Sequence, residues 1–498
     1  MTRAFNKELV FRTMGALLLI ETFFMALATG VSVYYSDPDL NAFIVSTTIT
    51  FLAGLLGLWF GRHASSRVGE REGYVIVAMV WVIFSLFGLL PYYLSGQISS
   101  FTDAWFETMS GFTTTGATIL NDVESLTHAA LFWRAMTQWL GGLGIIVLCV
   151  ALLPMFGLGG MQLYAAEVTG VNYEKLSPRI ADTAKLLWGV YILMTATETL
   201  LLKWAGMCGF DALCHSFATI ATGGFSTKNT SLMLYGPAVH YIVGIFTFLS
   251  GINFALLVHF LRGKPSRLLK DEETRWYVRS VIVCSLALTI GLCVYYGLAN
   301  PVWKEGTIPV LRHLEHSLRH GFFMAANAIT STGFAASDYM TWHPLLWVMV
   351  AMMFITGGSS GSTAGGIKWV RIIIFVKSGV AEFQRRIHPH AIIPIKLNGK
   401  PLPYTTINNV MAFMVFYILL IFLSVLVFSA CGVNLEESIG VAISSIGNVG
   451  MSIGQYGPSG SYALFPTFGK WWMTLIMLTG RLEIFTILLL FTKVLWKK

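Results

Sequence analysis

Four segments of 14 residues decide the fold of this chain, and they read DAWFETMSGFTTTG (103–116), DALCHSFATIATGG (211–224), HGFFMAANAITSTG (320–333) and ESIGVAISSIGNVG (437–450). Each segment begins with a polar or ionisable residue followed by a small one, continues as a mainly apolar stretch, and ends on a glycine. The closing glycines lie 108, 109 and 117 positions apart. Such regular spacing indicates an internal repeat of four units.

The apolar stretch in each unit is too short to cross a bilayer, because a spanning helix needs about 20 apolar residues. It is also too hydrophobic for an exposed loop, so it predicts a half-helix that enters the membrane and returns as extended chain. Non-helical backbone at membrane depth is tolerated only where protein packs around it or where it lines a watery path. Four such segments therefore predict a water-filled pore.

The composition of the whole chain agrees with a membrane protein. Hydrophobic residues make up 55% of the 498 residues and charged residues only 12%, and the mean hydropathy is +0.67. These values exclude a soluble globular protein. The first apolar run is longer than a signal-peptide core and is followed by another span, so we expect a retained helix. The predicted spans are 11–34, 40–61, 73–95, 130–155, 183–205, 235–262, 277–298, 343–378, 406–430 and 467–495.

The residues that end each unit indicate what crosses the pore. None of them carries a charge, so the ligands of a permeant ion must be carbonyl and hydroxyl groups. Rings of carbonyl oxygen replace the hydration shell of a monovalent cation, and glycine permits the necessary backbone turns, whereas a divalent cation calls for carboxylates. The negative C-terminal ends of the half-helices also favour a cation. The predicted filter residues are Thr114, Thr115, Gly116, Thr222, Gly223, Gly224, Ser331, Thr332, Gly333, Asn448, Val449 and Gly450.

Simpler interpretations exist for single features of these units. One Gly/Thr-rich stretch between helices is more often a plain turn, and only four in register favour a filter. The acids near the start of three units, Asp103, Asp211 and Glu437, are predicted to be N-caps of the half-helices. A secondary role in concentrating cations at the pore mouth stays open.

We therefore expect an all-α polytopic membrane protein with four pseudo-symmetric M1–P–M2 repeats, as in K⁺ channels, around one central pore. M1 and M2 are spanning helices and P is the half-helix. The M2 runs superimpose around Gly142, Gly251 and Arg481, whereas the third unit departs from them. The predicted divisions are 1–72 (two extra N-terminal transmembrane helices and an inner loop), 73–182, 183–276, 277–400 (with a broken helix and a gate loop) and 401–498.

The M2 run of the third repeat, 343–378, would measure more than roughly 50 Å as a single helix, so it must break. Its middle holds ten consecutive small or hydroxyl residues. Close helix packing is the alternative interpretation, but ten such residues exceed what a packing motif needs and favour a gate below the filter. The predicted gate residues are Gly357, Gly358, Ser359, Ser360, Gly361, Ser362, Thr363, Ala364, Gly365 and Gly366.

Arg481 lies in an otherwise apolar span. An unpaired charge is costly there, so the side chain should face the pore or a partner such as Glu483 or a loop carbonyl. A structural salt bridge is the alternative. Lys368 and Arg371, at the inner end of the broken helix, are expected to set topology rather than to contact ions.

The formal net charge of +8 at pH 7 comes from Lys and Arg that cluster between alternate spans. Under the positive-inside rule, these clusters place both termini in the cytoplasm. They form no single basic stripe with interleaved aromatics, so we expect no nucleic-acid partner. The basic inner loops 262–279 and 368–400 are candidate docking surfaces for a cytoplasmic partner, with lipid headgroups as the alternative.

Two glycine patterns lack the context of a nucleotide site. Gly361 and Gly366 have the spacing of a P-loop, but Ile367 occupies the position where a P-loop needs lysine. The glycines at 157–160 resemble the start of a dinucleotide-binding fingerprint, but Gln162 occupies the position where that fingerprint needs its last glycine. We expect the chain to bind no nucleotide or organic cofactor itself.

The six cysteines show no metal-ligand spacing, although Cys208 and Cys214 are close enough in sequence to pair. An enzyme would gather His, Asp or Glu at one depth, and we see no such gathering. A proton- or sodium-coupled symporter with the same pore architecture stays the alternative function, although the filters lack the acids expected of one.

The four filter glycines, the sequence GSTAGGIKWVRI (361–372) and the sequence LTGRLEIF (478–485) resemble the TrkH branch of the Trk/Ktr/HKT superfamily of potassium transporters. The resemblance covers essentially the whole chain, and the extra spans at about 11–61 are similar to this branch and not to the shorter KtrB form. Members with sodium preference commonly carry serine in place of the first filter glycine. The glycine at Gly116 therefore implies K⁺ as the transported ion, with Rb⁺ as surrogate.

The resemblance also implies a mechanism and partners. In the family the glycine-rich loop obstructs the ion path and moves to open it, and Arg481 would lie beside this loop as an electrostatic barrier to cations. The expected assembly is a homodimer in the bacterial inner membrane, with a ring of TrkA-like nucleotide-binding subunits beneath it.

Overall fold

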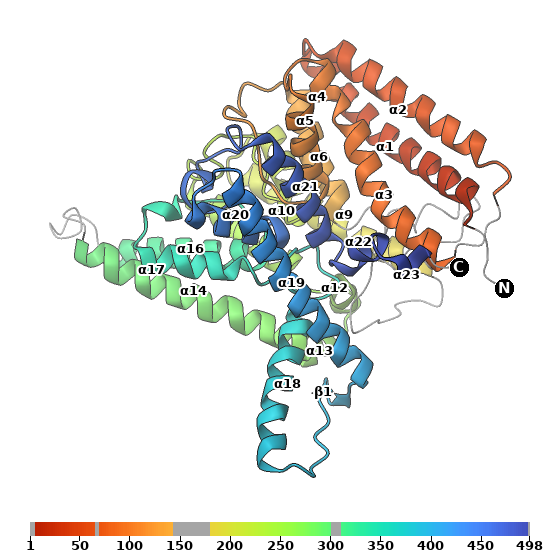
Figure 1. Ribbon diagram of the computed structural model, residues 1–498. Coiled ribbons are helices and arrows are strands. Elements are labelled where there is room, and N and C mark those ends of the chain that lie inside the picture. Colours follow the sequence, from red (N-terminus) through yellow and green to blue (C-terminus); the bar gives the residue numbers. More distant parts are fainter. Residues whose placement is uncertain (1–4, 65–68, 143–179, 300–309, 497–498) are drawn as a thin grey trace.

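The computed structural model describes residues 5–64, 69–142, 180–299 and 310–496. In this part of the chain six helices are long and apolar enough to cross a membrane, and a bent pair makes a seventh if it is counted as one span. The strands in the described part are limited to the antiparallel hairpin of β1 (Lys396–Leu397) and β2 (Lys400–Pro401). This hairpin and the neighbouring α18 extend from the body of the molecule (Figure 1).

The two extra N-terminal helices are α1 (Lys7–Tyr35) and α2 (Leu40–Phe60), which pack together on one flank (Figure 1). The helix α1 starts after Asn6, whose side chain accepts a hydrogen bond from the Leu9 amide at 3.1 Å. It ends at Ser36, which adopts a left-handed backbone conformation and reverses the chain. These helices confirm the spans predicted at 11–34 and 40–61.

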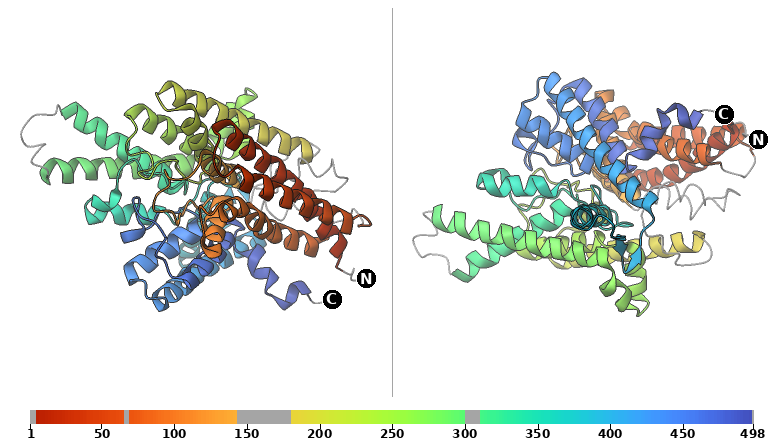
Figure 2. Two further views of the ribbon diagram at one scale, coloured as in Figure 1. Left: turned by 90° about the horizontal axis from the view of Figure 1, so that it is seen from above. Right: turned by 60° about the horizontal axis from the view of Figure 1, so that its bottom comes forward.

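Each repeat has a long helix, a pore helix and a second helix, and the repeats follow one another round a common centre (Figure 2). The long helices are α3 (Glu70–Gly88) with its continuation α4 (Leu90–Leu94), α9 (Ile180–Trp204), α14 (Glu272–Ala299) and α19 (Tyr404–Ala430). The pore helices are α5 (Phe101–Phe112), α10 (Gly209–Ile220), α16 (Val310–Ile329) and α20 (Leu435–Gly447). The second helices are α6 (His128–Gly142), α11 (Pro237–Ser250) with α12 (Phe254–Leu261), α17 (Pro344–Met353) with α18 (Trp369–Ile387), and α21 (Thr467–Arg481) with α22 (Phe485–Leu490). The shorter helices are α13 (Pro265–Lys270), η2 (Tyr339–Thr341), η3 (Gly454–Tyr456) and α23 (Lys493–Trp496).

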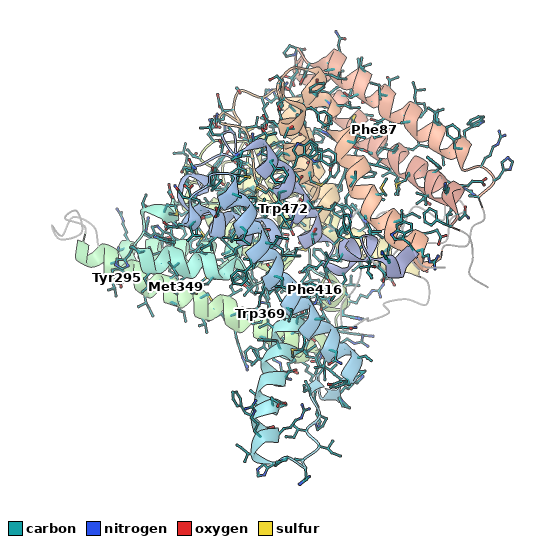
Figure 3. All side chains as sticks on the ribbon, in the orientation of Figure 1. Phe87, Tyr295, Met349, Trp369, Phe416 and Trp472 are labelled. Atoms are coloured by element: carbon teal, nitrogen blue, oxygen red, sulfur yellow. The ribbon has the colours of Figure 1, made fainter. Side chains whose placement is uncertain are left out.

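The half-helix prediction is confirmed in length for three repeats, where the pore helices have 12, 12 and 13 residues. The third is longer than expected, because α16 has 20 residues and begins at Val310 rather than near His320. Trp472 of α21 joins the second helix of the fourth repeat to its first, since its indole N–H donates to Ser424 Oγ of α19 at 3.1 Å (Figure 3).

The second helix of the third repeat is interrupted as predicted, with a non-helical loop between α17 and α18. Trp369 marks the start of α18 (Figure 3). The spans predicted at 235–262 and 467–495 are each interrupted, which was not predicted. The first of these bends by 104° between α11 and α12, and the second breaks between Arg481 and Phe485.

The first unexpected break is stabilised by tertiary contacts, and the second is marked by its backbone conformation. At the first break, the freed Gly251 carbonyl accepts from Ser359 N–H at 2.8 Å, and Phe254 N–H donates to the Gly361 carbonyl at 3.0 Å. The loop of residues 357–366, predicted to be the gate, thus satisfies backbone groups that a continuous helix would have paired internally. At the second break, Glu483 and Ile484 both have positive φ, 56° and 64°, which a right-handed helix does not allow. The span predicted at 130–155 is helical to Gly142, and its remainder lies outside the described residues.

Candidate ion-conduction site

The four pore helices end in the same backbone motif. Two residues before each filter glycine, the chain adopts a left-handed conformation, and the following amide donates back to the last turn of the helix. These left-handed residues are Thr114 (φ 52°), Thr222 (φ 54°), Ser331 (φ 55°) and Asn448 (φ 54°). The returning hydrogen bonds join Thr115 N to Ser110 O at 2.9 Å, Gly223 N to Ala218 O at 2.8 Å, Thr332 N to Asn327 O at 2.9 Å and Val449 N to Ser444 O at 3.0 Å. This Schellman pattern reverses the chain immediately after each half-helix, although the left-handed position usually belongs to glycine.

The four filter glycines belong to a closed ring. Each has positive φ, between 75° and 86°, and each lies so close to the next repeat that a Cβ would overlap a carbonyl oxygen there. In order round the ring, the pairs of glycine and carbonyl are Gly116–Gly223, Gly224–Thr332, Gly333–Val449 and Gly450–Thr115. The last pair returns to the first repeat, so segments far apart in sequence surround a single axis.

A cavity of about 240 Å³ opens on the side of the ring where the extended segments leave, and all four filter glycines line it. Tyr462 lines the same cavity, and its hydroxyl donates to the Gly450 carbonyl at 3.0 Å. Burial raises the pKa of this phenol, so it stays neutral and able to donate. The cavity therefore leads from solvent to uncharged oxygen-bearing backbone.

Side-chain carboxamides form hydrogen bonds with the filter segments, and sequence reasoning missed two of these side chains. Gln138 of α6 donates from Nε2 to the Gly223 carbonyl at 2.6 Å and accepts from Phe225 N–H at 3.0 Å. Asn327 accepts from Phe334 N–H at 3.3 Å. Asn448, a predicted filter residue, donates to Thr115 Oγ1 at 2.9 Å. A single polar residue in an apolar run carries no signal that could have identified Gln138 or Asn327.

The N-cap prediction for the three acids is wrong. Asp103, Asp211 and Glu437 lie within the first turns of their helices, and the N-cap positions are Ser100, Cys208 and Asn434. The acids instead bind groups from other segments. Their partners are Lys470 Nζ for Asp103 at 2.6 Å, Thr227 Oγ1 for Asp211 at 2.7 Å, and Gln455 Nε2 for Glu437 at 3.1 Å.

A buried ion pair beside the cavity was also missed. Arg134 Nε donates to Glu107 Oε1 at 2.6 Å, and both side chains are almost completely buried. The same carboxylate accepts from Ile119 N–H, while Arg134 Nη1 donates to the Ser226 carbonyl at 2.9 Å. The pair thus holds together the extended segments that leave the first and second filter units.

The gate-loop residues lie against the helix-end side of the ring. Gly365 N–H donates to the hydroxyl of Ser331, a filter residue, at 2.6 Å. Thr363 Oγ1 donates to the Ile220 carbonyl at the end of the second pore helix, at 3.0 Å. The loop and the cavity therefore lie on opposite sides of the four glycines.

Glu273 of α14 binds the middle of this loop and the first turn of α18, and it was not predicted. Its carboxylate accepts from Ser360 N–H and Ser360 Oγ, each at 2.6 Å, and from Val370 N–H at 3.0 Å. The side chain is buried. One anion thus joins the loop to the start of α18.

Arg481 contacts loop and helix carbonyls. Its Nη1 donates to the Thr363 carbonyl at 2.7 Å, and its Nη2 donates to the Gly141 and Gly142 carbonyls at 2.6 Å each. The loop carbonyl considered from sequence is therefore one of its partners, and Glu483 forms an ion pair with Arg371.

Lys368 donates to the Ala364 carbonyl, so this cation too binds the loop. The described cysteines include Cys208, which is exposed, and Cys214, which is buried, and both are free thiols. Within the described ranges, no group of three or more His, Cys, Asp or Glu side chains is arranged to hold a metal ion. The glycine pattern at 157–162 lies outside these ranges.

Comparison with known proteins identifies the family. The family profile described as TrkH, cation transport protein, matches residues 40–498. The chain is 37% identical to the Trk system potassium uptake protein TrkH of Halomonas elongata, covering 99% of both chains. It is 36% identical to the protein of the same name from Escherichia coli strain K12, covering 98% of this chain and 99% of the relative. The crystal structure of the potassium transporter TrkH from Vibrio parahaemolyticus superimposes with a TM-score of 0.86 at 31% identity, covering 98% of this chain and 99% of that one.

This agreement confirms the fold class predicted from sequence. The relatives are named as transporters, so the protein is a membrane transport protein and not an enzyme. With a profile that matches most of its length and full-length relatives above 30% identity, the chain belongs to the TrkH family of cation transport proteins.

Proposed function

We propose that this chain takes up K⁺, and Rb⁺ as its surrogate, across the bacterial inner membrane through a carbonyl-lined selectivity filter. The observation that carries the proposal is the closed ring of four glycines, each facing a carbonyl of the next repeat. An uncharged ring of this kind suits a monovalent cation, because carbonyl oxygens replace its hydration water without binding it too tightly to leave. The names of the relatives, Trk system potassium uptake proteins, support the choice of K⁺.

The filter in this proposal consists of the three residues that end at each glycine, namely 114–116, 222–224, 331–333 and 448–450. The gate consists of residues 357–366 together with Arg481. The contacts of Gly365 with Ser331 and of Arg481 with Thr363 support a loop that closes the path directly beneath the filter. The guanidinium adds a positive charge at the closed gate, which opposes cation entry.

Opening the gate requires a force from outside the membrane part. The relatives are named as parts of a Trk system, which supports an assembly of several subunits. We propose that this assembly is a homodimer of the chain with TrkA-like nucleotide-binding subunits. The basic inner loops 262–279 and 368–400 are the proposed docking surfaces, with both termini in the cytoplasm. In this proposal residues 1–72 form an N-terminal helical hairpin, and the four pore repeats are 73–182, 183–276, 277–400 and 401–498.

The first test is ⁸⁶Rb⁺ uptake into K⁺-loaded proteoliposomes that contain the purified protein. We expect uptake that external K⁺ blocks and Na⁺ blocks weakly, and Gly116→Ser should let Na⁺ compete more strongly. Uptake that depends on a proton or sodium gradient would instead support a coupled symporter. Folded protein that takes up no cation, even after deletion of residues 357–366, would overturn the proposal.

A further inference from the structure

We infer that Gln138, which lies outside the filter, is a positioning residue that sets the ion selectivity of the second filter segment. The inference rests on the proposed filter function. Gln138 is completely buried on α6, in the first repeat, yet its carboxamide binds the second repeat on both sides of Gly224. Its Nε2 donates to the Gly223 carbonyl, and its Oε1 accepts from Phe225 N–H.

These two hydrogen bonds orient the peptide groups that flank a filter glycine. Glycine has unusual backbone freedom, so a peptide beside it can rotate unless its polar atoms are held. The Gly223 carbonyl is also the one that faces Gly116 of the first repeat. Gln138 therefore controls where this carbonyl points at the contact between two repeats, and the number and direction of carbonyl ligands decide selectivity.

The third repeat provides independent support for this role. Phe334 follows filter glycine Gly333 as Phe225 follows Gly224, and its N–H also donates to a buried carboxamide oxygen. The acceptor there is Asn327 of the pore helix α16, a different position in a different helix. Two of the four repeats thus supply a buried carboxamide acceptor to the N–H that follows the filter glycine, from different helices, which supports a positioning role for such an acceptor.

The packing of the site agrees with a side chain that fixes the filter backbone. A Cβ at Gly223 would overlap the Gln138 carboxamide, so the glycine leaves room for the side chain that holds it. Because the carboxamide is neutral, it orients the filter without adding a charge to the ion path. Removing it would leave the buried Phe225 N–H without an acceptor, which costs free energy unless the peptide rotates.

The experiment compares Gln138→Met with the unchanged protein by ⁸⁶Rb⁺ uptake under Na⁺ and K⁺ competition. Methionine has a similar length and removes both hydrogen bonds, and we expect the preference for K⁺ over Na⁺ to fall by about tenfold. Gln138→Glu keeps an acceptor for Phe225 N–H but replaces the Nε2 donor to the Gly223 carbonyl with a carboxylate oxygen, so it too should lose selectivity. It also tests the inference if the Met variant does not fold. Thermal unfolding in detergent checks folding of each variant.

Thr247→Val is the matched control, because Thr247 of α11 occupies the position equivalent to Gln138 in the next repeat. Among the residues that the structure describes, its buried hydroxyl has no hydrogen-bond partner, so we expect unchanged selectivity. Gly116→Ser separates the two hypotheses. If Gly116→Ser weakens selectivity while folded Gln138→Met and Gln138→Glu leave it intact, the inference is wrong and the filter stands. If Gly116→Ser has no effect either, the filter assignment itself fails.

Discussion

At the scale of single residues, the filter glycines are the positions least able to change. Each combines a positive φ with a neighbouring carbonyl where a Cβ would lie. A side chain there is disfavoured by the backbone conformation and by the contact at once. Left-handed strain and steric overlap of this kind cost about 1–3 kcal/mol each.

Gly333→Ala should therefore disrupt the filter without unfolding the membrane part. We expect strongly reduced ⁸⁶Rb⁺ uptake or lost discrimination against Na⁺, because the new methyl group displaces the Val449 carbonyl. Gly189→Ala in α9 is the control, since no atom of the described residues lies within 4 Å of its Cβ position. Equal behaviour of the two variants would argue against a rigid ring.

Arg481 is the residue whose loss should most directly weaken the closed gate. Arg481→Gln removes the charge and most of the donors to the Thr363, Gly141 and Gly142 carbonyls. We expect ⁸⁶Rb⁺ uptake without any partner subunit to rise several-fold, measured in the same proteoliposomes. Arg385→Gln, which removes an exposed ion pair on α18, should leave it unchanged. Unaltered uptake in Arg481→Gln would mean that another contact closes the path.

At the scale of elements, the interrupted second helices are the feature that connects gate and filter. In the third repeat the loop between α17 and α18 is held by contacts from other repeats, including the Gly251 carbonyl freed by the break after α11. Glu273 adds an anchor at the start of α14. The loop therefore has a defined position in this structure, and under the proposed gate function, releasing one anchor should shift the balance toward an open state.

Glu273→Gln tests this anchor. The amide keeps one acceptor oxygen where the carboxylate has two, so at least one of its three hydrogen bonds is lost or weakened. Losing about 1.4 kcal/mol of closed-state stability raises the open fraction about tenfold. Partner-free ⁸⁶Rb⁺ uptake should increase accordingly. Glu382→Gln, at an exposed ion pair of α18, is the control and should change nothing.

At the scale of the whole molecule, the four repeats must close into a ring, and the contact between the fourth and the first repeat completes it. Lys470 of α21 binds Asp103 of α5 at 2.6 Å, and Tyr462 N–H donates to the Thr118 carbonyl at 2.8 Å. The lysine side chain is buried, so its ion pair is screened less than a surface pair. This closure stabilises the pore as one unit.

Lys470→Met should lower the free energy of unfolding by about 1–3 kcal/mol, because it leaves a partly buried carboxylate without its cation. Lys228→Met removes a pair with Glu124 that is more than a third exposed on both sides, and it should cost about 0–1 kcal/mol. Thermal unfolding in detergent measures both. Equal melting temperatures for the two variants would contradict a stabilising role for the contact between the first and fourth repeats.

Much of the fold and the site could be predicted from local pattern. The four segments whose glycines meet in one ring were predicted from their spacing, and the broken third helix was predicted from its length and its glycine-rich middle. The breaks after Ser250 and Arg481 were missed because the apolar run continues through both. The acids taken as N-caps lie in the first turn, since a cap depends on where the helix starts and not on the nearest acid.

The sequence by itself determined that the chain spans a bilayer and that it contains four repeated units. It also determined that each 14-residue unit ends in uncharged residues, whose backbone suits a cation. These properties can be predicted from composition and spacing, because whether a segment lies in lipid or water restricts its residue types within that segment. Only the tertiary structure decided which carbonyl faces each glycine and which groups bind the gate loop. It also decided that Gln138 contacts the second filter segment and that Glu273 contacts the gate loop. These contacts join positions many residues apart, so their geometry depends on how the helices pack and leaves no local pattern to read.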